Sequence, residues 1–316
     1  MIILSACSHS NQISFQQLIS VRSDTIQIDN TRDTLIFGSK GTVLFFEKES
    51  FQLPDGTAPS GKISILLKEC YSNSDIVREN LATTSDGKLL ETKGMINVTA
   101  FSNTQALRLK KGEKFIIHFP KDSSDRKKQM NLFYGNANTS GAVNWKLDSE
   151  LSRPVAPSST LKRLDTSDSL GNENYNKKFS KKYKAFKNSA ITSINAAELN
   201  YYIFSSAKLG WINCDFFWEV PDEKIDYYVK TNPELKPNIK LVFKQAKSIL
   251  AGALEGDKYV FKNVPINQEI KIVAITFEGS KPVMAVIETK TGKQVFNKLD
   301  YKPFSVSDLE KQLNTP

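Results

Sequence analysis

The chain has 316 residues, of which 40% are hydrophobic and 24% are charged, and its formal net charge is +9 at neutral pH. This length suffices for two domains of ordinary size, and beyond the first residues no run of about 18 apolar residues is present to span a membrane as a helix. The charge is concentrated, because residues 161–187 carry eight basic and three acidic side chains and so hold five of the nine net positive charges.

The first residues contain a candidate lipid-attachment site. Residues 4–7 read Leu-Ser-Ala-Cys and resemble the lipobox of bacterial lipoproteins, in which the cysteine is lipidated and becomes the mature N-terminus. The resemblance implies a lipid anchor at Cys7, a membrane partner and a location at the outer membrane, with the leaflet left open. Residues 8–12 are polar and suit a tether, so we assign residues 1–19 to the lipobox and tether.

The segment before Cys7 is shorter than a secretory signal requires. Such a signal has a basic start and an apolar stretch of about 7–15 residues, whereas only residues 1–4 precede the small residues here and none of them is basic. A start codon placed too late, trimming of the first residues and a chance match are the three explanations left open.

Residues 20–148 have the pattern of an antiparallel β-domain. Short apolar or alternating runs occur at residues 42–46, 63–67, 96–101 and 115–119, and turn sequences such as Asp86-Gly87 separate them. Several short strands at this spacing predict a sandwich or barrel rather than a parallel sheet with crossover helices. The only helical turn that we expect in this region spans residues 75–81.

Residues 149–190 are predicted to be a flexible basic linker between two domains, because their low apolar content cannot offset the entropy of ordering them. Basic residues alternate with aromatic ones near the end of this segment and could bind an anionic partner, such as lipid headgroups or lipopolysaccharide phosphates. The alternative is a solvated linker, which is the commoner fate of a charge run. The candidate binding residues are Lys177, Lys178, Lys181, Lys182, Lys184 and Lys187.

Residues 191–316 are predicted to form a second β-sandwich with a short helix at its end. Strand patterns occur at residues 201–204, 239–243, 259–261, 270–275 and 283–287. The run from Ser307 to Glu310 has the form of a capping box, and Leu309 and Leu313 would lie on one face of the helix that it opens. The predicted fold class is therefore all-β, with two sandwiches, a flexible basic linker and a C-terminal helix.

Two segments resemble known β-domains. Residues 41–120 are similar to a sandwich domain of Bacteroidetes putative lipoproteins, which is distantly similar to that of ankyrins and netrin receptors. The matching stretches include residues 51–56, 61–65, 84–87, 90–95 and 112–114, with 132–135 and 144–145 closing the pattern. Residues 209–215 resemble a motif of the same proteins, and residues 256–265 resemble the prealbumin-like carboxypeptidase-regulatory fold. The resemblance implies an architecture and no particular activity.

The residues that carry chemistry in enzymes are sparse. Only two histidines are present, and we interpret His118 as a strand residue on a sheet face rather than as the base of a nucleophile system. Carboxylate pairs such as Asp222-Glu223 are interpreted as solvated charge, and neither a phosphate loop nor a calcium loop is present. We therefore expect no catalytic residues, no metal and no cofactor.

The cysteines and short modification motifs fit an exported protein. Cys70 and Cys214 are expected to be buried free thiols in different domains, with a disulfide between them as the alternative. Thr25, Thr34 and Ser169 each follow an aspartate and precede an apolar residue, which resembles the O-glycosylation sites of exported Bacteroidetes proteins.

The sequence thus predicts a non-catalytic, lipid-anchored protein of the cell envelope that binds or scaffolds an envelope protein or glycan. Two alternatives stay open. One is an envelope hydrolase acting on glycan or peptide, and the other is an accessory subunit of an outer-membrane assembly. Nucleic acid is the weakest partner, because the predicted address lies outside the cytoplasm.

Overall fold

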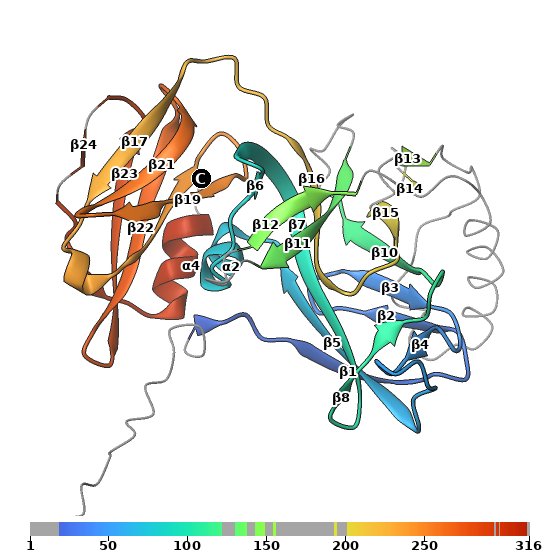
Figure 1. Ribbon diagram of the computed structural model, residues 1–316. Helices are drawn as coiled ribbons and strands as arrows, with labels where there is room; N and C mark the ends of the chain where they lie inside the picture. Colours follow the sequence, from blue (N-terminus) through green and yellow to red (C-terminus); the bar gives the residue numbers. More distant parts are fainter. Residues whose placement is uncertain are drawn as a thin grey trace, which may run out of the picture.

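A computed structural model describes residues 19–121, 130–137, 143–148, 154–155, 193–194, 201–293, 295–296 and 298–314. Within these residues the chain forms four larger β-sheets and two short α-helices (Figure 1). The predicted all-β fold class with a short C-terminal helix is confirmed. Cys7 and the predicted basic linker, apart from residues 154–155, lie outside the described residues.

The first sandwich is built from an eight-stranded and a six-stranded sheet. The eight-stranded sheet has the path β1-β5-β7-β16-β11-β12, with β6 and β8 each paired to β7. Its strands are β1 (Asp24–Asp29), β5 (Lys62–Cys70), β6 (Thr84–Ser85), β7 (Lys88–Ser102), β8 (Gln105–Ala106), β11 (Asn131–Ala137), β12 (Val143–Leu147) and β16 (Gly210–Phe217).

The six-stranded sheet has the order β13-β14-β15-β10-β3-β2. Its strands are β2 (Thr34–Phe37), β3 (Val43–Phe46), β10 (Phe115–Pro120), β13 (Pro154–Val155), β14 (Ser193–Ile194) and β15 (Tyr201–Ser206), and a separate pair joins β4 (Phe51–Gln52) to β9 (Arg108–Leu109). Buried side chains from both sheets form one apolar core, for example Ile65 and Val98 from one sheet with Phe115 and Phe204 from the other. This arrangement is a two-layer sandwich.

The second sandwich has a four-stranded and a five-stranded sheet. The four-stranded sheet runs β20-β21-β17-β24 and the five-stranded sheet runs β19-β18-β22-β23-β25. The strands are β17 (Lys224–Lys230), β18 (Asn238–Phe243), β19 (Ile249–Ala251), β20 (Ala253–Glu255), β21 (Lys258–Pro265), β22 (Glu269–Glu278), β23 (Lys281–Lys290), β24 (Val295–Phe296) and β25 (Lys302–Pro303), with a 3-10 turn η2 at Pro233–Leu235. Its own core contains Tyr227 and Phe261 from one sheet and Leu241 and Ile272 from the other.

Strand pairing divides the chain differently from the boundaries expected from the sequence. Strands β15 and β16, assigned above to the second domain, pair with β10, β7 and β11 of the first sandwich. Residues 149–200 therefore connect two strands of the same sandwich, and residues 218–223 make the connection to the second. A long polar insertion within a domain is tolerated, because lengthening a loop adds little to the entropy of closing it. Its composition can therefore be the same as that of a linker between domains.

The two sandwiches share a third apolar core, which we call the junction core. It combines residues on the outer face of the eight-stranded sheet, such as Met95 and Trp145, with residues on the outer face of the five-stranded sheet, such as Val273 and Met284. The helices α2 (Asn73–Arg78) and α4 (Val306–Asn314) lie between the sandwiches and contribute to this core (Figure 1). The sandwiches are thus packed against each other instead of being joined only by a linker.

The alternation of side chains along β18 and β22 explains this packing. Residues 239, 241 and 243 of β18 enter the core of the second sandwich, whereas residues 240 and 242 face the junction. The burial pattern of β22 is continuous over residues 270–276, because both faces of this strand are covered. Main-chain hydrogen bonds also cross the junction, including Thr83 N–H to the Ile249 carbonyl at 2.7 Å and Thr92 N–H to the Lys247 carbonyl at 3.0 Å.

Both helices differ slightly from expectation. Helix α2 begins after Ser72, whose hydroxyl accepts a hydrogen bond from Asp75 N–H at 3.1 Å, so it starts and ends earlier than the expected turn. For α4 the capping residue is Ser305, which exchanges hydrogen bonds with Asp308, and not Ser307. Leu309 and Leu313 are both buried, as their spacing predicted.

Candidate functional site

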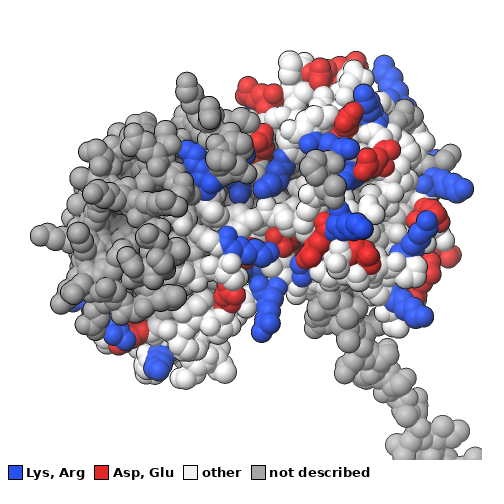
Figure 2. Space-filling view, turned by 180° about the vertical axis from the view of Figure 1, so that it is seen from behind, with Lys and Arg blue, Asp and Glu red and all other residues white. Residues whose placement is uncertain are grey.

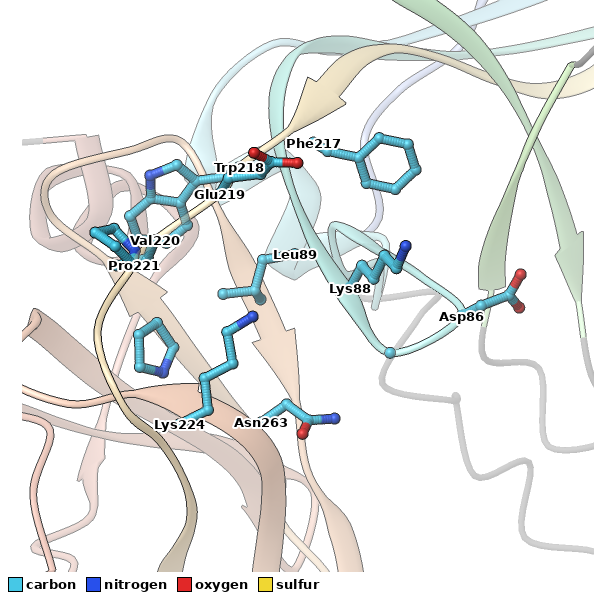
Figure 3. A pocket seen from close by; sticks show the side chains of 12 residues that line it. Asp86, Lys88, Leu89, Phe217, Trp218, Glu219, Val220, Pro221, Lys224 and Asn263 are labelled. Carbon is cyan, nitrogen blue, oxygen red and sulfur yellow. The ribbon is translucent and has the colours of Figure 1, made fainter.

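A hollow lies where the chain passes from the first sandwich to the second. This junction cleft has a volume of about 820 Å³ and is lined by Asp86, Gly87, Lys88, Leu89, Phe217, Trp218, Glu219, Val220, Pro221, Lys224, Asn263 and Pro265. The turn between β6 and β7 forms one side, the connection after β16 forms another, and β17 with β21 forms the third (Figure 3). A volume of this size suits a small ligand.

The β6–β7 hairpin is shaped by its two turn residues. Asp86 has φ +48° and Gly87 has φ +77°, and Ser85 pairs with Lys88 across the turn. Two consecutive residues in the left-handed region form the kind of tight turn whose twist matches a β-hairpin, and Asp-Gly is a preferred sequence for it. The sequence-based interpretation of Asp86-Gly87 as a hairpin turn agrees with this geometry.

Aromatic side chains form one wall of the cleft. The main-chain N–H of Trp218 donates a hydrogen bond to the Leu89 carbonyl of β7 at 3.0 Å. The Trp218 ring packs edge to face on Phe243, with the ring centroids 5.0 Å apart. Phe217 packs edge to face on Phe133 at 5.6 Å. Because these contacts anchor the rings in two of the apolar cores, the cleft wall is preorganised.

Charged groups surround the aromatic wall. Lys88 lies 5.6 Å from the centre of the Phe217 ring, in a cation–π contact. Glu219, Lys224 and Asn263 are exposed and lie around the opening in Figure 3. A ligand with an apolar face and several hydroxyl or amide groups would find both kinds of contact here.

The two carboxylates of the cleft do not face each other. Asp86 accepts hydrogen bonds from Lys146 and from Asn144 on β12, and these contacts lower its pKa. Its carboxylate points away from Lys88 and Leu89 in Figure 3, whereas Glu219 lies on the other side of the cleft. Acid–base hydrolysis of a glycosidic bond needs two carboxyl groups flanking the bond, so the geometry of this cleft favours binding.

A cluster of buried charges around α2 is structural. The Glu69 carboxylate is 2% exposed and accepts the N–H groups of residues 40 and 42 at 2.7 and 2.9 Å. Glu79 accepts the ammonium of Lys68 at 2.7 Å and the N–H of residue 21 at 2.6 Å. Each carboxylate is held by main-chain donors, which fix the loop after β2 onto β5 and the start of the described chain onto the end of α2.

The structure places only some of the predicted site residues. Thr25 is exposed on β1, and Thr34 is partly buried at the start of β2, with its hydroxyl donating to the Arg32 carbonyl at 3.2 Å. Ser169, Cys7 and the six lysines of the basic segment lie outside the described residues. Of the predicted site residues, only Thr25 and Thr34 belong to the described part of the chain, and they lie on different strands.

The buried histidine and thiols behave as structural residues. His118 is 1% exposed in the middle of β10, and burial lowers its pKa to about 3, so it stays neutral. Cys70 and Cys214 are buried free cysteines, as expected. They do not lie in different domains, because Cys70 pairs with Met95 and Cys214 with Gly94 on opposite sides of β7.

Acidic side chains are interspersed with basic ones on the described surface that faces the viewer in Figure 2. Among the described residues no group of three or more His, Cys, Asp or Glu side chains could hold a metal ion. No helix in this part of the chain is long and apolar enough to cross a membrane.

The junction cleft was not predictable because its lining comes from four separate stretches of sequence. Of this lining, only the Asp86-Gly87 turn is recognisable from the sequence, as a turn between two strands. Comparisons with protein-family models, curated proteins and solved structures find no match to this chain.

Proposed function

We propose that this protein is a lipid-anchored binding protein of the bacterial cell envelope, and that it binds a glycan in the junction cleft. The observation that carries the proposal is the cleft itself, in which anchored aromatic rings lie beside exposed hydrogen-bonding groups from both sandwiches. Sugar rings present apolar faces and hydroxyl edges, and aromatic side chains with a polar rim complement both.

Residues 19 and 20 are held against α2, at the junction of the two sandwiches. Arg78 of α2 donates to the Ile19 carbonyl at 2.6 Å and to the Ser20 carbonyl at 3.1 Å. Residues 8–18 can span at most about 40 Å when extended, so a lipid at Cys7 would hold the junction of the two sandwiches within that distance of the membrane.

Glycan binding is tested by screening the purified protein against an array of neutral and acidic oligosaccharides, followed by calorimetry with the strongest binder. Glu219→Ala and Lys224→Ala should each weaken binding about tenfold, because each removes a charge-assisted hydrogen bond. Lys262→Ala is the matched control, since Lys262 is an exposed lysine on β21 that does not line the cleft. Absence of any bound oligosaccharide, or equal binding by all three variants, would refute the proposal.

The same samples separate binding from hydrolysis. Mass spectrometry of the oligosaccharide after prolonged incubation should show it unchanged, and cleavage would favour the envelope hydrolase. The lipid anchor is tested by the intact mass of the mature protein purified from its host. A chain that starts at Cys7 and carries acyl groups would support the anchor, and an unmodified Met1 terminus would refute it.

A further inference from the structure

Each sandwich contributes one lysine to the lining of the junction cleft. Lys88 belongs to the first sandwich and Lys224 to the second. Lys88 is the first residue of β7 and pairs with Ser85 across the β6–β7 turn. Lys224 is the first residue of β17 and pairs with Pro265, which also lines the cleft. Strand pairing thus fixes the backbone from which each lysine side chain extends.

Both ammonium groups are available to a ligand. The Lys88 ammonium lies 5.6 Å from the centre of the Phe217 ring, and this ring carries no charge that could cancel its own. The side chain of Lys224 extends from β17 towards Leu89 in Figure 3. In the part of the chain that the structure describes, both lysines are exposed and neither forms an ion pair.

The two carboxylates of the cleft lining differ in their partners. Asp86 forms an ion pair with Lys146 of β12 and accepts a hydrogen bond from the Asn144 amide at 3.1 Å. The Asp86 carboxylate also points away from the two cleft lysines in Figure 3. Glu219 forms no ion pair with any residue that the structure describes. The two cleft lysines therefore face one unpaired carboxylate, and the cleft retains one positive charge.

Two carboxylates that precede Lys224 in the sequence do not change this balance. Asp222 accepts a hydrogen bond from the Gln268 amide at 2.8 Å and does not line the cleft. The Glu223 carbonyl accepts the N–H of Ile266, which continues the pairing of β17 with β21 by one residue. Because successive side chains of a strand point to opposite faces, Glu223 faces away from the cleft, and it is not part of the lining.

We propose that the glycan bound in the junction cleft is acidic, and that Lys88 and Lys224 recognise the carboxylate of a uronic or sialic acid. This inference rests on the proposed glycan binding and specifies its ligand. A sugar carboxylate carries one negative charge at neutral pH, which matches the charge that the cleft retains, and it accepts charge-assisted hydrogen bonds from ammonium groups. The Phe217 and Trp218 rings pack against the apolar face of the sugar, and Glu219 accepts hydrogen bonds from its hydroxyl groups.

The preference is tested with probes that differ only in the charge of the carboxylate. Sialyllactose and cellobiouronic acid are each compared with their methyl esters by calorimetry, together with any other acidic oligosaccharide that binds in the glycan screen. At least one acid should bind about tenfold more tightly than its ester, because the ester cannot form the charge-assisted hydrogen bonds. Raising the ionic strength should reduce this preference. The acid that responds distinguishes a uronic from a sialic acid as the source of the carboxylate.

Charge variants locate the preference. Lys88→Gln and Lys224→Gln should each lower the ratio of acid to ester affinity several-fold, because each removes one ammonium group. Glu219→Ala should raise this ratio, although it weakens the binding of both forms, because it removes a negative charge from the cleft. A higher ratio cannot result from partial unfolding. Lys262→Gln is the matched control, since Lys262 is an exposed lysine of β21 outside the lining, and it should leave the ratio unchanged.

The outcomes separate this inference from the proposed function. A screen that yields only neutral binders, or esters that bind as tightly as the acids, would overturn the acidic preference and leave glycan binding intact. A ratio that both cleft-lysine variants leave unchanged, or that Lys262→Gln lowers equally, would also overturn it. Absence of any bound oligosaccharide would instead refute the proposed function, and this inference with it.

Discussion

The junction core predicts that the two sandwiches unfold together, and Leu309→Ala tests this. Leu309 is 0% exposed on α4 and packs in the junction core, to which both sandwiches contribute. Replacing a buried leucine by alanine costs about 2–5 kcal/mol. We expect about 3 kcal/mol here, because α4 has only nine residues and can shift to close part of the cavity. In a protein of this size the midpoint of thermal unfolding should fall by roughly 5 °C.

The assay is urea denaturation followed by tryptophan fluorescence and by circular dichroism, with hydrogen exchange of peptides from β10 and β22. The two optical transitions should coincide, and protection should fall in both peptides. Ser307→Ala is the control, because Ser307 is an exposed residue on the same helix. Two separate transitions, of which Leu309→Ala moves only the one reported by β22, would refute a shared core.

Three further changes test other parts of the fold. Lys240 is fully buried on the junction face of β18, and burial lowers its pKa to about 7. Because the unfolded chain keeps this proton up to about pH 10.5, stability should rise by about 1.4 kcal/mol per pH unit between pH 7 and 10.5 relative to Lys240→Met, as urea titrations at several pH values would show. Glu69→Ala should lower the free energy of unfolding by about 3 kcal/mol, because main-chain donors lose their buried acceptor, and Glu69→Gln should cost less. Burial raises the pKa of the Cys70 thiol, and Cys214 is also buried. A thiol reagent should therefore leave both cysteines untouched in the folded protein and modify them in guanidinium chloride. A third reactive thiol in guanidinium chloride would indicate that Cys7 carries no lipid.

The sequence predicted the strands well because strand periodicity is a local property. The alternation in residues 63–67 and the apolar run at 270–275 both correspond to strands, β5 and β22. The burial of Leu309 and Leu313 followed from their spacing of four residues on a helix. In each of these examples the decisive information lies within about ten residues of chain.

The pairing of strands was not predictable in the same way. Residues 201–204 have the pattern of an ordinary strand, and nothing in their composition, or in that of residues 209–215, shows that strands β15 and β16 pair with β10 and β7. The polar segment before them suggested a domain boundary, and the boundary was therefore placed one hairpin too early. Cys214 was assigned to the wrong domain for the same reason.

Predicting which side chains are buried at the junction would need both the periodicity of the strands and their pairing. Lys240 and Lys271 alternate with apolar residues in their strands, a pattern that normally predicts a solvated face. Here that face packs against the other sandwich, so the two lysines are buried. A buried lysine is retained against a substantial desolvation cost, and the two differ in how that cost is met. Lys240 donates to a main-chain carbonyl at 3.3 Å and tends to lose its proton, whereas Lys271 donates to the Gln312 carbonyl at 2.7 Å and lies 3.6 Å from the Glu288 carboxylate.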